Sequence, residues 1–140
     1  MRILSVDYGL ARIGLALSDP TGMLAQGLSV LKRTSDATAI ADIHHIASER
    51  EVTEIVVGLP RNMDGSIGPR AQHCQAFASA LAERTGLPVV LYDERLTTVV
   101  AERMLVAADV SRRKRRQVID AVAATILLQG FLDSRRNAES

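Results

Sequence analysis

Four carboxylates in the sequence stand where an unpaired charge would be expensive. Asp7 closes an apolar strand-like run, Asp93 and Glu94 close another, and Asp120 lies inside an apolar segment. Desolvating an uncompensated carboxylate is costly, and repulsion between neighbouring carboxylates adds to that cost. A divalent cation removes the penalty, and Mg²⁺ and Mn²⁺ prefer oxygen ligands. This pattern indicates metal-assisted hydrolysis of phosphodiester bonds.

Each carboxylate also has an ordinary interpretation. Asp7 fits a turn that ends a strand, and Arg95 could pair with its two acidic neighbours at the surface. Asp120 fits the exposed first turn of a helix, where an anion is favoured. Consecutive strand residues point to opposite faces, so only one of Asp93 and Glu94 can join a given site. The alternation alone does not say which.

The charge distribution favours a polyanionic partner. The net charge is only +1, yet the run 112–116 holds five consecutive basic residues, whereas the acidic residues are scattered. Such a patch would bind a phosphate backbone. The alternative is a solvated loop between two helices. Because the chain has only two Tyr, two Phe and no Trp, an aromatic platform for stacking single-stranded bases is not expected.

The spacing of apolar and turn residues predicts an α/β fold of βββ-α-β-α-β-α-α order. Strands are expected at 3–8, 13–18, 26–31, 54–58 and 89–92. Four helices are also expected: the first starts near residue 35, the second ends near 85, the third starts at 97, and the fourth runs over about 115–133. A meander followed by alternating helices and strands predicts a mixed sheet covered by helices. We expect one domain over residues 1–140.

Four separated motifs resemble the YqgF (RuvX) family over essentially the whole chain. They are Val6–Gly9 with Gly14–Ala16, then Val57–Ser66, then Asp93–Thr98, and finally Asp120–Ala124 with Ile126–Gln129. The resemblance implies a ribonuclease H-like fold, with three antiparallel strands, then two parallel ones, and helices on both faces. It also implies a nuclease dependent on Mg²⁺ or Mn²⁺, with Asp7, Glu94 and Asp120 as catalytic metal ligands.

Residues near these motifs are candidates for substrate binding. They are Asn62, Asp64 and Arg70 after the fourth strand, Arg95, Thr97 and Thr98 at a predicted helix N-terminus, and Lys114 and Arg115 in the basic run. The first group also fits a polar surface loop, and Thr97 also fits a helix cap.

The resemblance leaves two substrates open. One is pre-16S rRNA processed at its 5′ end, and the other is a Holliday junction, whose symmetry would favour a homodimer. An ATP-binding protein and a non-catalytic RNA-binding module are further alternatives. The single cysteine, Cys74, and the lack of a long apolar run predict a cytoplasmic protein without membrane contact.

Overall fold

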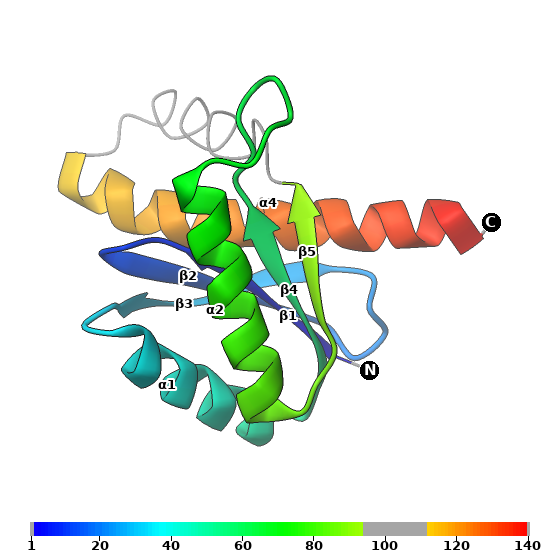
Figure 1. The fold of residues 1–140 in the computed structure, drawn as a ribbon. Helices are drawn as coiled ribbons and strands as arrows, with labels where there is room; N and C mark the ends of the chain where they lie inside the picture. The colour runs from blue at the N-terminus through cyan, green and yellow to red at the C-terminus, as the bar shows by residue number, and fades with distance from the viewer. Residues whose placement is uncertain (1, 94–111, 140) are drawn as a thin grey trace.

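The computed structural model describes residues 2–93 and 112–139, with the side chains of residues 2–93 and 122–135. In chain order the elements are β1 (Arg2–Tyr8), β2 (Arg12–Ser18), β3 (Ala25–Lys32), α1 (Asp36–Glu49), β4 (Val52–Leu59), α2 (Pro69–Thr85), β5 (Val89–Asp93) and α4 (Arg112–Glu139) (Figure 1). All five predicted strands are confirmed. The helix predicted from Thr97 lies outside the described residues.

The strands form one mixed sheet in the order β3-β2-β1-β4-β5. The pairs β1–β2 and β2–β3 are antiparallel, whereas β1–β4 and β4–β5 are parallel. This arrangement confirms the predicted three antiparallel and two parallel strands. Because β1, β4 and β5 run the same way, their carboxyl ends meet at one edge of the sheet. Asp7 and Asp93 lie at that edge.

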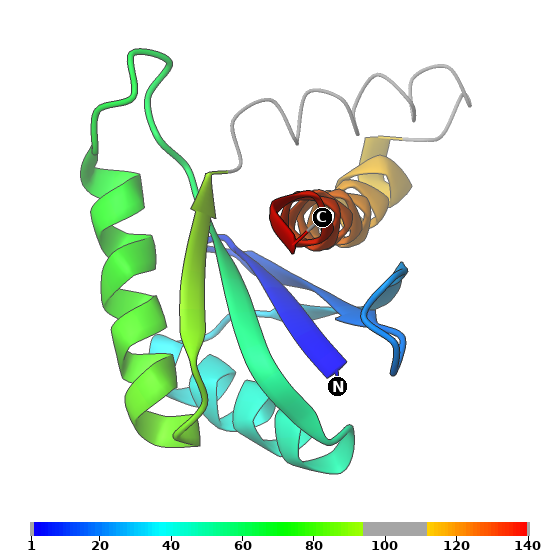
Figure 2. The same ribbon diagram turned by 90° about the vertical axis from the view of Figure 1, so that its right-hand side faces the viewer.

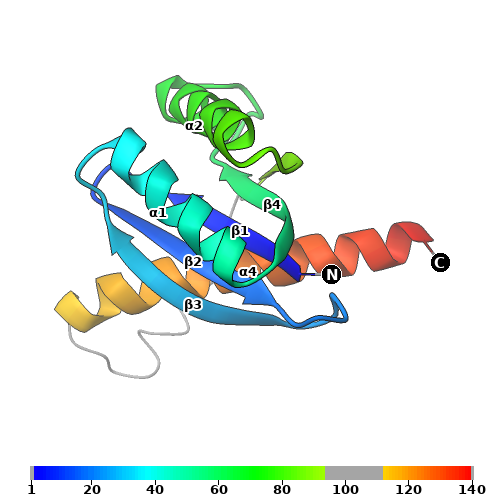
Figure 3. The same cartoon turned by 90° about the horizontal axis from the view of Figure 1, so that it is seen from below.

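Helices cover both faces of the sheet, α1 and α2 on one side and α4 on the other (Figures 2 and 3). Alternation along β1 supplies both cores. Leu4, Val6 and Tyr8 join the core under α1 and α2, whereas Ile3 joins the core under α4. Apolar residues every second position thus bury both faces of the central strand.

Local sequence signals set the ends of the first two helices. The Ser35 hydroxyl accepts a hydrogen bond from the Thr38 amide at 3.1 Å and caps α1, which starts near residue 35 as expected. Pro69 occupies the start of α2, and Gly86 ends it with a left-handed φ of 71°. Cys74 is buried within α2, where it serves as a small core residue.

The basic run is not the loop that was one predicted alternative. Helix α4 begins at Arg112, so the run forms its first residues. Arg and Lys are good helix formers, and nothing separates them from the apolar segment that follows. Asp120 consequently lies more than two turns into α4, which excludes the first-turn interpretation of its charge. None of the described helices is long and apolar enough to cross a membrane.

Alanine substitutions at two glycines test the described backbone conformation. A Cβ at Gly9 would lie 2.6 Å from the Arg12 carbonyl oxygen, so Gly9→Ala forces the β1–β2 turn to move. We expect it to lower the free energy of unfolding by about 1–3 kcal/mol in urea denaturation. The matched control is Gly130→Ala in α4, where the nearest atom is the Tyr92 hydroxyl at 3.7 Å.

In the control the new methyl group fits, and Ala favours a helix over Gly by about 0.5–1 kcal/mol. Gly130→Ala should therefore raise the free energy of unfolding. Equal stability of Gly9→Ala and the parent would contradict the described turn.

Candidate active site

Asp7 lies at the carboxyl end of β1, on the face of the sheet that α4 covers. It pairs with Gly14 of β2 and is partly exposed. Two residues earlier on the same face, the buried Ser5 hydroxyl donates a hydrogen bond to the Ala124 carbonyl at 2.8 Å. This bond fixes α4 against β1 close to Asp7.

Helix α4 runs antiparallel to β1. Toward its C-terminus, the Gln129 side chain accepts a hydrogen bond from the Ala25 amide at the start of β3, at 2.9 Å. One turn earlier, Thr125 lies beside Gly27, farther along β3. Since β3 and β1 both run antiparallel to β2, the N-terminal part of α4 extends in the direction in which β1 reaches Asp7.

Asp93 lies on the opposite face from Asp7. The preceding residue, Tyr92, packs against the α4 core, and its ring meets the Phe131 ring edge-on at 5.7 Å. Alternation along β5 therefore directs the Asp93 side chain toward the α2 side. Asp93 is therefore expected to lie on the other face from Asp7, and the choice of Glu94 as the ligand stays a prediction.

The remaining predicted ligands are less fully described. Glu94, like Arg95, Thr97 and Thr98, lies outside the described residues, and for Asp120, Lys114 and Arg115 only the backbone in α4 is described. Within the described part of the chain, no three Asp, Glu, His or Cys side chains gather into a metal-binding group. Glu94 and the side chain of Asp120 lie outside that part of the chain.

Asn62 and Asp64 lie in the loop between β4 and α2, which rises beyond the carboxyl ends of β4 and β5 (Figure 1). Asp64 accepts hydrogen bonds from the Ser66 amide at 2.9 Å and the Ser66 hydroxyl at 2.6 Å, and these bonds lower the pKa of Asp64. Asn62 donates to the same hydroxyl at 2.9 Å. Both exposed side chains therefore shape the loop, and their contact with substrate stays a prediction.

A cluster that the sequence did not reveal lies behind the β1–β2 turn. The Tyr8 hydroxyl donates to Asp36 Oδ1 at 2.6 Å, and Arg33 Nε donates to the same oxygen at 2.8 Å. Arg33 also donates to the Leu10 carbonyl at 3.2 Å. No local pattern in the sequence connects Asp36 with a tyrosine 28 residues earlier.

These contacts shift the pKa values of Asp36 and Tyr8. Burial opposes the charged form of Asp36, but hydrogen bonds from Tyr8 and Arg33 outweigh it and lower the pKa of Asp36. Burial and the bond to the carboxylate raise the pKa of Tyr8. The cluster therefore holds a carboxylate, a phenol and a guanidinium in their usual charge states at neutral pH.

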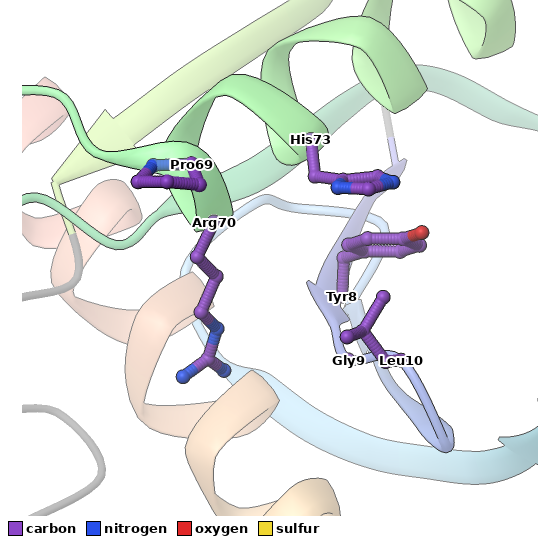
Figure 4. A pocket seen from close by; sticks show the side chains of 6 residues that line it. All are labelled: Tyr8, Gly9, Leu10, Pro69, Arg70 and His73. Atoms are coloured by element: carbon purple, nitrogen blue, oxygen red, sulfur yellow. The ribbon is translucent and has the colours of Figure 1, made fainter.

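A hollow of ≈ 280 Å³ opens between the β1–β2 turn and the first turns of α2 (Figure 4). Its lining residues are Tyr8, Gly9, Leu10, Pro69, Arg70 and His73. The Tyr8 ring stacks on Phe77, with 4.4 Å between centroids, and on His73, with 6.4 Å. Arg70, predicted to bind substrate, is thus exposed beside an apolar hollow at the same end of β1 as Asp7.

The strand order, the helices on both faces and the acidic end of the central strand define a protein of the ribonuclease H-like class. The family model for RuvX, described as Holliday junction resolvase, matches residues 1–134. The chain therefore belongs to the RuvX family, as the motifs predicted. The family and its named nuclease relatives make the chain a hydrolase acting on phosphodiester bonds, of a kind that typically depends on metal.

Two relatives are closely similar over nearly their whole lengths. One from Moorella thermoacetica is 55% identical over 95% of both chains, and one from Halalkalibacterium halodurans is 53% identical over 97% of this chain and 99% of its own. Both carry the curated name "Putative pre-16S rRNA nuclease".

Among solved structures, RuvC of T. thermophilus in complex with a Holliday junction substrate matches with a TM-score of 0.57. At 15% identity over 97% of this chain and 96% of RuvC, this match shows the shared fold.

The Asp36 cluster predicts a specific pH dependence of stability. The pKa of Asp36 in the folded protein lies below the ordinary value of 3.8. The contribution of the Asp36 carboxylate to the free energy of unfolding is therefore complete above that pH and is lost as the pH falls through the folded pKa. Asp36→Asn should be less stable than the parent at pH 7. The gap should narrow below about pH 4 in urea denaturation.

Asp42→Asn, which changes an exposed carboxylate of the same helix, is the control and should stay close to the parent throughout. A gap for Asp36→Asn that is constant from neutral to acidic pH would show that the Asp36 charge adds no stability.

Proposed function

We propose that this protein is a metal-dependent nuclease that processes the 5′ end of pre-16S rRNA in the cytoplasm. Asp7, Glu94 and Asp120 would hold Mg²⁺ or Mn²⁺. The observation that carries the proposal is the place of Asp7, a partly exposed carboxylate at the carboxyl edge of the central strand, beneath α4. A carboxylate there offers accessible oxygen ligands to a hard cation.

Glu94 is assigned because Asp93 faces the other way. Along β5, Val90 and Tyr92 pack toward α4, so alternation directs Asp93 away from the face of Asp7. The family resemblance implies Glu94, which lies outside the described residues.

Asp120 is assigned from the register of α4 on β1. The Ser5 hydroxyl bonds to the Ala124 carbonyl. Asp7 follows Ser5 by one step on the same strand face, and Asp120 precedes Ala124 by about one turn on the same helix. Since α4 and β1 are antiparallel, both steps lead toward the same end of the molecule. This correspondence supports a site shared by the two aspartates.

Metal ions bound by these carboxylates would stabilise charge on the scissile phosphate and lower the pKa of the attacking water. The protein would hold the nucleic-acid strand by its phosphates, using Lys114 and Arg115 in α4 and Arg70 in α2. Arg95, Thr97 and Thr98 would extend that contact beside Glu94. Asn62 and Asp64 would maintain the shape of the β4–α2 loop at the rim of the active site.

The nature of the relatives favours rRNA as substrate. Proteins more than 50% identical over nearly the full chain carry the rRNA name. The junction is supported by the description of the family model and by a fold neighbour of 15% identity. Cleavage of a four-way junction by a homodimer is therefore the second candidate.

The decisive experiment measures single-turnover cleavage of two substrates in Mg²⁺ or Mn²⁺. One is a precursor RNA that spans the 5′ end of 16S rRNA, and the other is a four-way DNA junction. Asp7→Asn and Glu94→Gln should each lower the cleavage rate at least about 10³-fold, because each removes a charged metal ligand. Asp93→Asn, on the opposite face, is the matched control and should stay within about threefold of the parent.

Preferred cleavage of the precursor RNA supports the rRNA function, and preferred cleavage of the junction replaces it with the second candidate. If Asp7→Asn cleaves as fast as the parent, the assigned site is wrong. Urea denaturation of each variant separates loss of chemistry from loss of folding.

A further inference from the structure

The hollow beside α2 is separated from Asp7 by a single step of the chain. Tyr8, which lines it, follows Asp7 directly but points to the other face of the sheet, toward α1 and α2. The hollow therefore opens at the same carboxyl edge as the candidate active site. Asp7 and the hollow thus lie at the same end of β1, on opposite faces of the sheet.

The walls of the hollow suit a flat, apolar group. The Leu10 side chain is 65% exposed, the His73 ring is also exposed, and the Pro69 ring completes the apolar lining, whereas the Tyr8 ring stacked against His73 is only 3% exposed (Figure 4). An exposed leucine beside aromatic and proline rings leaves apolar surface that a ligand can cover. Heterocyclic bases have such faces and stack on aromatic side chains.

The rim of the hollow suits an anion. Arg70 lines it from the first turn of α2, and none of the described residues that line it is acidic. The nearby carboxylate of Asp36 is already engaged by the Tyr8 hydroxyl and by Arg33. A cationic rim around an apolar interior matches a nucleotide, which has an apolar base and a phosphate.

The turn that carries Leu10 is held in place before any ligand arrives. The Arg33 amide donates to the Ala11 carbonyl at 2.9 Å, and the Arg33 guanidinium donates to the Leu10 carbonyl at 3.2 Å. Asp36 in turn holds that guanidinium. Preorganisation of this kind lowers the entropy cost of binding.

We propose that this hollow binds the base of one unpaired nucleotide next to the scissile phosphate, with Arg70 on that nucleotide's phosphate. The assignment rests on the proposed nuclease function, which identifies the bound polymer as nucleic acid. A base inside a duplex is stacked and paired, so only an unpaired one enters. The pocket thus selects single-stranded substrate at the cut, and it needs one stacked base rather than an extended aromatic platform.

The test uses single-stranded RNA in which one abasic nucleotide is moved along the sequence. Binding is measured by fluorescence anisotropy on the full chain carrying Asp7→Asn, so that the RNA stays intact. One abasic position should weaken binding about tenfold, because a stacked base is lost there. Adding His73→Ala should remove that penalty, and His73→Phe, which restores a ring, should bring it back.

Arg70 has a separate readout. Arg70→Ala should lower the slope of log affinity against log salt by about 0.7, because one phosphate contact to a single strand is lost. Arg84→Ala is the matched control, since it removes the same charge from the last turn of the same helix, where Arg84 contacts His44. It should leave both the slope and the abasic penalty unchanged.

Equal binding at every abasic position, or a penalty that survives His73→Ala, would overturn the base pocket. Duplex RNA that binds as tightly as single-stranded RNA would do so too. The nuclease function fails on a different result, equal cleavage by Asp7→Asn and the parent. A flat abasic profile with cleavage lost in Asp7→Asn would reject the pocket alone.

Discussion

The structure depends on the burial of both faces of β1. As the central strand of the sheet, β1 places Leu4, Val6 and Tyr8 toward α1 and α2, and Ile3 and Ser5 toward α4. A shift of one residue would exchange every side chain between the two cores, so the register is strongly fixed. The same alternation brings Asp7 to the α4 face at the point where the strand ends. One constraint therefore builds the fold and positions the candidate catalytic carboxylate.

Helix α4 can bring a second carboxylate to the position of Asp7. Between Ala124 and Arg135 it is attached by polar contacts of different kinds: the Ser5 hydroxyl on the Ala124 carbonyl, the Ala25 amide on Gln129, and the paired hydrogen bonds from Arg135 to Glu54 at 2.9 and 2.6 Å. These contacts fix which turn of the helix meets which part of the sheet. An aspartate in α4 can then serve a site on β1 although more than 100 residues separate the two in sequence.

The elements were predictable because their signals are local. Apolar periodicity predicts the strands, a capping residue predicts the start of α1 near residue 35, and Gly86 predicts the end of α2. The start of α4 was predicted three residues late, because a run of like charges was taken as a break, although Arg and Lys favour helices.

What the sequence could not give is pairing over distance. The face of Asp93 depends on where Tyr92 meets Phe131 in α4. The cluster of Tyr8, Arg33 and Asp36 forms only when β1, β3 and α1 come together. The hollow likewise combines a turn and a helix that are distant in sequence. For the site itself, the fold positions Asp7. Glu94 is assigned from the family resemblance and from the direction of Asp93, and Asp120 is assigned from the register of α4 on β1.

The most direct measurement of the central claim is Mn²⁺ binding followed by electron paramagnetic resonance, without any nucleic acid. The parent and Asp93→Asn should bind Mn²⁺ alike, whereas Asp7→Asn and Asp120→Asn should each bind at least about tenfold more weakly, since each removes a carboxylate ligand. Parental Mn²⁺ affinity in Asp7→Asn, or a loss confined to Asp93→Asn, would contradict a metal site on the α4 face of β1.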